Sequence, residues 1–203
     1  MVFQIAALII LLTFYGCYFA KMISQRKKGI TTDQMGKGKA GFVKFVEVTM
    51  KTAACLVPIV EVVSIALQTT YFHTSIRIAG LCIGAAGTAV FVISVLTMRD
   101  SWRAGVSKTD QTELVTDGIY QISRNPAFLG FDLVYIGILM MFFNWILFAI
   151  SVFAMVMFHL QIVNVEEDFL IETFGEPYLE YRRKVHRYLG RNRRPKYTTT
   201  SGK

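Results

Sequence analysis

Five long apolar blocks, separated by short polar segments, constrain the fold of this chain more than any other feature. They cover approximately residues 3–20, 52–70, 76–98, 127–143 and 145–165. A helix needs about 20 apolar residues to cross a ~30 Å hydrocarbon layer, and a helix satisfies its backbone hydrogen bonds internally. The pattern therefore predicts an all-α integral membrane bundle of about five transmembrane helices, followed by a cytoplasmic C-terminal helical extension.

Composition agrees with a single membrane domain, because 53% of the 203 residues are hydrophobic and 18% are charged. Residues 1–98 should supply three spans, and residues 99–203 a catalytic loop, a helical hairpin and C-terminal helices. The first block starts at residue 2 without a preceding basic segment, so we expect a retained helix rather than a signal peptide. Cys17, Cys55 and Cys82 lack metal-ligand spacing and predict neither a disulfide framework nor a metal site.

The basic residues predict the orientation, because Lys and Arg collect in cytoplasmic loops. All but one of the 22 lie in residues 21–51, 99–124 and 182–203, on one side of a five-span bundle; the exception is Arg77. The N-terminus is then outside, and the C-terminus and active site face the cytoplasm. The net charge of +8 fits attraction to anionic lipid headgroups. It predicts no nucleic-acid partner, since no aromatic-basic binding module accompanies it.

The second block has polar features that a membrane helix must accommodate. Lys44 and Lys51 precede it, so we expect this helix to begin along the membrane surface before turning inward. Pro58 predicts a kink. Glu61 costs about 2.5–3.5 kcal/mol at membrane depth and should face protein or a wet cavity. It is either a functional carboxylate or an inactive one, held protonated or near the interface. In the third block, Gly80 and Gly84 predict a close helix-packing seam.

A polar loop precedes the fourth block. Gly118 supplies a permissive backbone, and Pro126 biases Asn125 away from helix. The loop should stay irregular at the mouth of the hairpin, where its amides and carbonyls can bind a ligand. Taken alone, it also fits a simple helix start with Arg124 reaching to lipid headgroups. Trp102, further upstream, either walls such a cleft or anchors at the interface.

Paired carboxylates end the fifth block. Glu166 and Glu167 could mark only the exit of a helix into water. However, an apolar stripe continues beyond them, so the helix should keep packing as it leaves the bilayer and cover a cleft. The members of the stripe are Leu170, Phe174, Tyr178 and Tyr181. His159 precedes Glu166 by seven residues and shares its helix face. It is either a packing residue held by a hydrogen bond or a residue that lines the cleft.

These residues form two motifs with a specific spacing. The first reads Gly118-x-Tyr120-x-x-x-Arg124-Asn125-Pro126-x-Phe128-x-Gly130, and the second reads Glu166-Glu167-x-x-Leu170-x-x-x-Phe174-Gly175-x-x-Tyr178-x-x-Tyr181. Together they resemble the isoprenylcysteine carboxyl methyltransferase family of integral membrane enzymes, over about the C-terminal half. The resemblance implies S-adenosylmethionine as methyl donor, held between the loop and the last helices, and S-adenosylhomocysteine as product.

The resemblance also implies residue roles. The loop backbone would hold the adenosine part of the cofactor, at Gly118, Ile119, Tyr120, Arg124, Asn125 and Pro126. Glu166 or Glu167 would pair with the cofactor's ammonium. A guanidinium would hold the acceptor carboxylate, and the candidates are Arg124, Arg182, Arg183 and Arg187. The predicted catalytic residues are therefore Arg124, Glu166, Glu167 and Arg183.

Three positions depart from the family pattern. Asn125 stands where the family usually has His, Phe128 where it has Tyr, and His186 where it more often has Pro. A ring nitrogen and a hydroxyl are thus missing from the loop, although the Asn125 amide can still donate and accept hydrogen bonds.

The predicted function is methyl transfer to a lipophilic acceptor from the bilayer, namely carboxyl O-methylation of an isoprenylcysteine-like substrate. Two alternatives stay open. A phospholipid amine acceptor would first lose a proton, so Glu166 or His159 would act as a base. A noncatalytic scaffold or sensor of the same fold would explain the changes at Asn125 and Phe128. The sequence predicts neither the natural acceptor nor the oligomeric state.

Overall fold

The computed structural model describes residues 1–106 and 113–192, which form helices joined by loops. Within these residues, four helical segments are long and apolar enough to cross a membrane. They are α1 (Val2–Lys27), α2 (Gly41–Ala66), α3 (Thr74–Met98) and α5 (Trp145–Gln161), which runs through a π-helical turn (Ile162–Glu166) into α6 (Glu167–Phe174). The predicted all-α membrane bundle is confirmed.

A fifth apolar helix, α4 (Pro126–Met141), has 16 residues and is about 24 Å long. It forms the predicted hairpin with α5. Asn144 makes the turn, because its side chain accepts a hydrogen bond from the Leu147 amide at 2.9 Å and so caps α5. The short helices are η1 (Arg99–Ser101), η2 (Gly118–Gln121) and α7 (Glu176–Lys184).

Helix α2 begins at Gly41, well before the apolar block at residue 52, and runs on without a separate surface segment. Its first turns are amphipathic rather than apolar. Val46, Met50 and Ala53 are buried, whereas Lys44 is exposed. A block of continuous apolar residues therefore marks the middle of this helix but misses its start.

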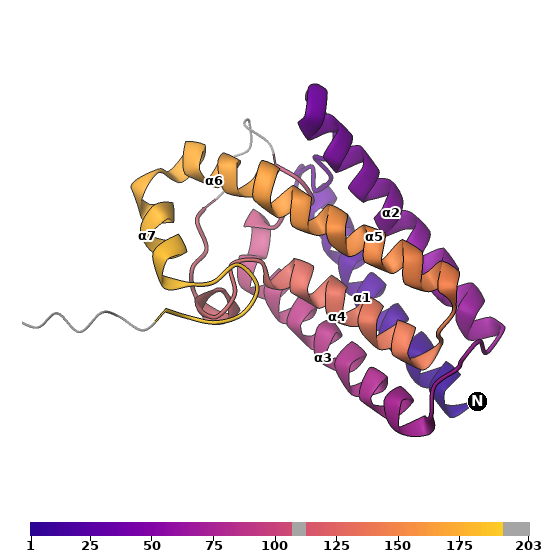
Figure 1. Ribbon diagram of the computed structural model, residues 1–203. Helices are drawn as coiled ribbons and strands as arrows, with labels where there is room; N and C mark the ends of the chain where they lie inside the picture. Colours follow the sequence, from indigo (N-terminus) through magenta and orange to yellow (C-terminus); the bar gives the residue numbers. More distant parts are fainter. Residues whose placement is uncertain (107–112, 193–203) are drawn as a thin grey trace, which may run out of the picture.

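The bundle is assembled around the close contact between α3 and α4 (Figure 1). Glycines make this contact possible. A Cβ atom on Gly137 would lie 2.5 Å from the Gly84 nitrogen, and one on Gly80 would lie 2.7 Å from the Gly137 carbonyl oxygen. The predicted packing seam is present, and Gly137 is its complement on the facing helix. On the other side of this pair, α1 packs against α3, and α2 packs against α5.

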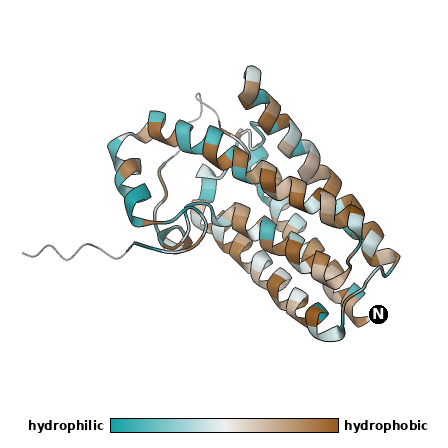
Figure 2. Cartoon of the chain, in the orientation of Figure 1, coloured by the Kyte–Doolittle hydropathy of each residue, from teal (hydrophilic) through white to brown (hydrophobic). Residues whose placement is uncertain are grey.

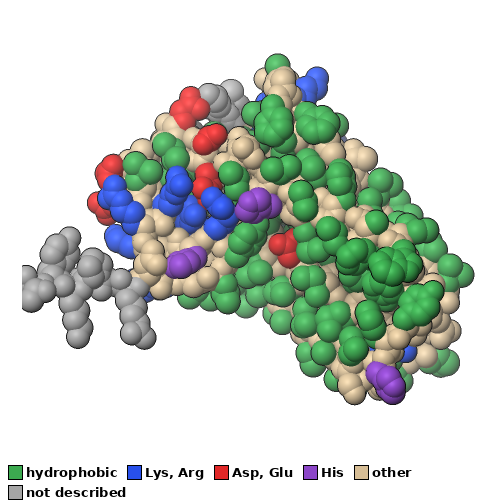
Figure 3. Space-filling view, viewed as in Figure 1, with side chains coloured by type: hydrophobic (Ala, Val, Ile, Leu, Met, Phe, Trp, Pro, Cys, Tyr) green, Lys and Arg blue, Asp and Glu red, His purple; other side chains and the backbone are tan. Residues whose placement is uncertain are grey.

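Polarity separates the bundle from one end of the molecule. The four long helices and α4 are mostly hydrophobic, whereas many residues of α6 and α7 are hydrophilic (Figure 2). Figure 3 shows hydrophobic side chains over the bundle and charged side chains gathered over α6 and α7. We refer to the end of the bundle covered by α6, α7 and residues 113–125 as the capped end.

The capped end has its own small core of Tyr120, Tyr178, Tyr181 and Val185. The Tyr181 hydroxyl donates to the Tyr120 carbonyl at 2.6 Å. Residues 185–192 close over it, since the Arg124 amide donates to the His186 carbonyl at 3.0 Å. The apolar stripe predicted beyond the paired carboxylates therefore packs against the loop that precedes α4.

Glu61 is fully buried in the bundle, and both of its carboxylate oxygens lack a hydrogen-bond partner among the described residues. The hydroxyls of Tyr15 and Tyr135 are also buried and unpartnered there. The side chain faces protein rather than lipid, as expected for an acid at membrane depth.

Replacing Gly137 by Ala should destabilise the bundle by about 1–3 kcal/mol, because the new methyl group would meet the α3 backbone and force the helices apart. Thermal unfolding in detergent would measure the shift. Gly16→Ala in α1 is the matched control, since a Cβ there has nothing within 4 Å. Equal midpoints for the two variants would contradict the role of the glycine seam.

Candidate functional site

Two cavities meet at the capped end. The larger has a volume of about 420 Å³ and lies between α1, α2 and α4. The smaller has a volume of about 140 Å³ and lies beneath α6, between the start of α4 and the segment after α3. The two share six lining residues: Trp102, Arg103, Gly105, Ala127, Phe128 and Glu166. The two cavities are therefore adjacent, and we call their common wall the junction.

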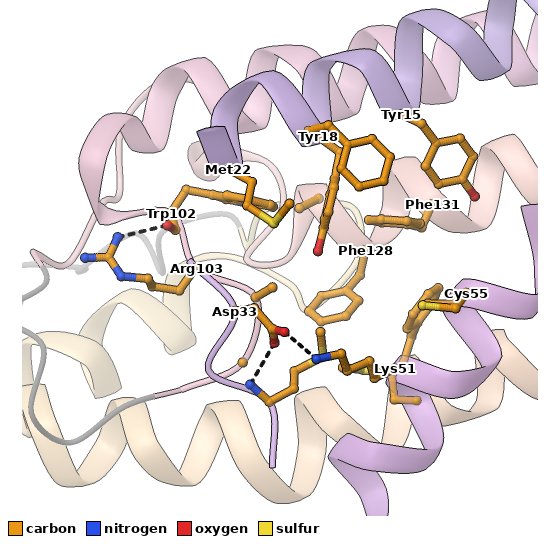
Figure 4. Close-up of a pocket in the computed structure, with 18 of the residues that line it drawn as sticks. Tyr15, Tyr18, Met22, Asp33, Lys51, Cys55, Trp102, Arg103, Phe128 and Phe131 are labelled. Atoms are coloured by element: carbon orange, nitrogen blue, oxygen red, sulfur yellow. Dashed lines mark hydrogen bonds and ion pairs between the residues drawn. The ribbon is translucent and has the colours of Figure 1, made fainter. Parts of the chain in front are cut away.

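The larger cavity is mainly apolar. Its walls away from the junction include Tyr15, Tyr18, Phe19, Met22, Met50, Ala54, Cys55, Pro58, Phe131 and Phe158. Tyr18 of α1 and Phe131 of α4 pack edge to face, with ring centroids 6.4 Å apart, and Cys55 lies on the α2 side (Figure 4). The volume falls in the range of small-molecule sites, and the lining suits a hydrocarbon chain.

The smaller cavity gathers much of the predicted site. Tyr120, Arg124, Asn125, Pro126 and Glu166 all line it. Leu170 and Phe174 from the predicted apolar stripe cover it. Residues separated by some 40 positions in the sequence thus reach one cavity from the loop before α4 and from the end of α5.

Gly118 and Ile119 shape the loop rather than line either cavity. Gly118 has a φ of 57° and begins η2, where a Cβ would lie 3.2 Å from the Thr97 methyl. Only a residue without a side chain adopts this backbone easily. Ile119 packs against the tyrosine core of the capped end.

A π-helical turn ends at the first of the two carboxylates. Residues Ile162–Glu166 form this turn between α5 and α6 and change the helical register. Glu166 lines both cavities. Glu167 is 4% exposed and faces a group of arginines instead. The two adjacent acids, either of which was expected to pair with the cofactor's ammonium, therefore have different surroundings.

Glu167 accepts two hydrogen bonds from Arg187, at 2.8 and 3.1 Å, and pairs with Arg124 at 3.0 Å. Arg182 lies 3.9 Å away. The bond to Glu167 raises the pKa of the Arg187 guanidinium above its ordinary value. Arg124 also donates to the Tyr178 hydroxyl at 2.9 Å, while its Nε is buried and has no partner among the described residues.

Arg183 lies outside both cavities. Its side chain is 69% exposed and pairs with Glu176 at 3.3 Å. His159 also lies outside them, and its Nδ1 is 2.8 Å from the Tyr188 hydroxyl, with the two rings stacked. Of the sequence alternatives for His159, the geometry matches a hydrogen-bonded packing residue.

The residues that depart from the family pattern have defined environments. The Asn125 side chain donates to the Arg187 carbonyl at 3.0 Å, which ties the loop to the C-terminal segment. Phe128 lies at the junction of the cavities and packs against Phe158 with ring centroids 5.4 Å apart. A phenyl ring at this junction leaves the wall apolar where a hydroxyl would have made it polar.

Buried tyrosines frame the site without contributing an ionised group. Burial raises the pKa of the Tyr120 and Tyr181 phenols above their ordinary range. The Tyr120 hydroxyl is 2.9 Å from the Ser94 hydroxyl of α3, and Tyr181 donates to a carbonyl. Both phenols therefore remain neutral and hold the loop in place.

Sequence reasoning named Trp102 of the segment between the cavities but left its role open. Trp102 is 4% exposed and lines both, so it walls the site rather than anchoring at an interface. The buried Gln25 side chain holds it by donating to the Trp102 carbonyl at 2.9 Å. Asp33 and Lys51 line the larger cavity. The position of Asp33 follows from loop packing, for which the sequence carries no periodic signal, whereas Lys51 lies on α2.

Comparison with known proteins points to methyltransferases. A family model described as phospholipid methyltransferase matches residues 75–177, just over half of the chain. Among individual proteins, a protein-S-isoprenylcysteine O-methyltransferase of Saccharomyces cerevisiae is 39% identical over 36% of this chain and 30% of its own length. A probable one from Oryza sativa subsp. indica is 29% identical over 53% of this chain and 57% of its own length. The chain thus matches between about a third and just over half of these relatives.

Replacing Glu167 by Gln should lower stability by about 2–3 kcal/mol, because it leaves the buried Arg124 without its counter-charge. The cost is below that of a fully buried pair, since Arg187 and Arg182 are partly exposed. Thermal unfolding in detergent would test this. Glu176→Gln, which removes an exposed pair, serves as control. Indistinguishable midpoints would show that the arginine cluster is not needed for the capped end.

Proposed function

This chain belongs to the phospholipid methyltransferase family, and we propose that it transfers a methyl group from S-adenosylmethionine to a lipophilic acceptor at the membrane. The observation that carries the proposal is the adjacent pair of cavities. The smaller lies under the capped end and has Arg124, Asn125 and Glu166 in its lining, and the larger is mainly apolar and lies among the spanning helices. A water-soluble donor and a lipid acceptor need such an arrangement in order to meet.

The residues of the smaller cavity fit the donor. Glu166 makes no ion pair within the described part of the chain and can accept from an ammonium group. The buried, unpartnered Nε of Arg124 can donate to a carboxylate. The amino-acid end of S-adenosylmethionine carries both groups. The amides of Tyr120, Arg124 and Asn125 and the Tyr120 carbonyl are hydrogen-bonded within the chain, so the side chains that line the cavity would contact the adenosine. Bound there, the cofactor supplies an electrophilic methyl group on a positively charged sulfur.

The larger cavity suits the acceptor chain, and the isoprenylcysteine carboxylate is the acceptor that we propose. Such a carboxyl group has a pKa of about 3.5 and is ionised at neutral pH, so this chain need not supply a base. Trp102 and Phe128 would exclude water at the junction. Holding donor and acceptor in line can lower the barrier by about 7–11 kcal/mol. The active site would face the cytoplasm, on the side where the basic residues gather.

A second acceptor class is favoured by Glu166 itself. Its carboxylate lies at the junction of the two cavities, where the reacting group of the acceptor would be. An amine acceptor, such as a phospholipid headgroup, must lose a proton before or during methyl transfer. Glu166 could accept this proton, whereas a carboxylate acceptor has none to give.

The first test is calorimetric binding of S-adenosylmethionine to the purified protein in detergent. Glu166→Gln should raise Kd roughly 10- to 100-fold, because a charge-assisted hydrogen bond contributes about 1.5–3 kcal/mol. Glu176→Gln should bind as the wild type does. If the wild type does not bind the cofactor, the noncatalytic scaffold becomes the better explanation.

The second test separates the two acceptor classes by methyl transfer at saturating cofactor. With an S-prenylated cysteine, Glu166→Gln should retain most of kcat. With a phospholipid amine, loss of the base should reduce kcat about 100-fold or more. A wild type that methylates only the amine would rule out the carboxyl acceptor.

A further inference from the structure

Among the described residues that line the larger cavity, Lys51 is the one lysine. Lys51, on α2, pairs with Asp33 of the loop between α1 and α2. Both residues lie beside Phe128 at the end of the cavity that meets the cofactor side (Figure 4). An ion pair at this place borders the region where the head of a bound lipid would lie.

Asp33 is the fixed member of the pair. Its segment runs beside Ala104, since the Gln34 amide donates to the Ala104 carbonyl at 2.8 Å and the Ala104 amide donates to the Thr32 carbonyl at 2.9 Å. The second carboxylate oxygen of Asp33 accepts from the Met35 amide at 3.2 Å. Backbone contacts therefore hold this carboxylate against the wall that both cavities share.

Lys51 is the movable member. Its ammonium sits on a four-carbon stem with several rotatable bonds, and its side chain is 42% exposed. The other basic side chain near this wall, Arg103, donates to the carbonyls of Asp100 and Trp102 and points away from the cavity (Figure 4). Lys51 is thus the cation best placed to turn toward a group inside the cavity.

The pair itself contributes little to stability. Partly exposed ion pairs are worth about 0–1 kcal/mol, so a competing anion can replace Asp33 at small cost. An anion attached to a hydrocarbon chain would gain further, because the chain fills the apolar cavity and brings the anion to Lys51.

We propose that Lys51 binds an anionic group of the acceptor, a carboxylate or a phosphate, and that Asp33 occupies Lys51 while the cavity is empty. The inference rests on the proposed function, because it takes the larger cavity to be the acceptor site. It makes Lys51 a specificity-determining residue for lipids with a negative headgroup. It also gives the two members of one ion pair opposite effects on binding.

The test uses direct binding to the purified full chain in detergent, with three probes. These are N-acetyl-S-farnesylcysteine, its methyl ester and a long-chain monoalkyl phosphate. Lys51→Met should weaken at least one anionic probe about tenfold and leave the neutral ester unchanged. Asp33→Asn should bind the same anionic probe as tightly as the wild type or severalfold more tightly. The control is Lys44→Met, which also removes one positive charge from α2 but at an exposed position, and it should leave the binding of all three probes unchanged.

The opposite signs distinguish this role from a structural one. If the pair only holds the loop, Lys51→Met and Asp33→Asn should weaken all probes alike, the ester included, and the proposal would be overturned. Dependence on Lys51 for the farnesylated probe alone would assign a carboxylate, and for the alkyl phosphate alone a phosphate.

Methyl transfer by the same preparations separates this proposal from the proposed function. Lys51-dependent binding without methylation of any acceptor would keep the anion site and reject the methyltransferase function. Methylation with an unchanged KM in Lys51→Met would keep the function and reject the anion site.

Discussion

The carboxylate of Glu167 connects the chain segments that close the site. It binds Arg124 of the loop before α4, Arg187 of the C-terminal segment and, at longer distance, Arg182 of α7. Removing these charges from water is costly unless each finds a partner, so the segments are stable only when they are together. The loop that lines the smaller cavity is thus positioned by a residue that lies outside that cavity.

The spanning helices supply the second constraint. Glycines on α3 and α4 bring these two helices close enough for their backbones to touch. The opposite side of α4 then presents Phe128 and Phe131 toward α1 and α2, where the aromatic side chains leave a cavity rather than a seam. Small residues on one face of α4 and large ones on the other therefore decide where a lipid chain can be accommodated.

The two constraints meet at the junction between the cavities. Trp102 and Phe128 make this region apolar, and Glu166 adds one carboxylate. A dry, preorganised junction strengthens electrostatic interactions and keeps water from competing with the acceptor.

The sequence by itself determined the helical class, most of the spans and the grouping of Tyr120, residues 124–126 and Glu166. The length of an apolar block and the spacing of a motif are local properties, so they can be read directly from the order of the residues. It did not determine the start of α2, where amphipathic turns precede the apolar block, or the wall formed by Trp102 with Asp33 and Lys51 beside it. Nor could it separate Glu166 from Glu167. Consecutive helical residues point about 100° apart, and the packing partners that decide which acid faces the cavities and which faces the arginines come from distant parts of the chain.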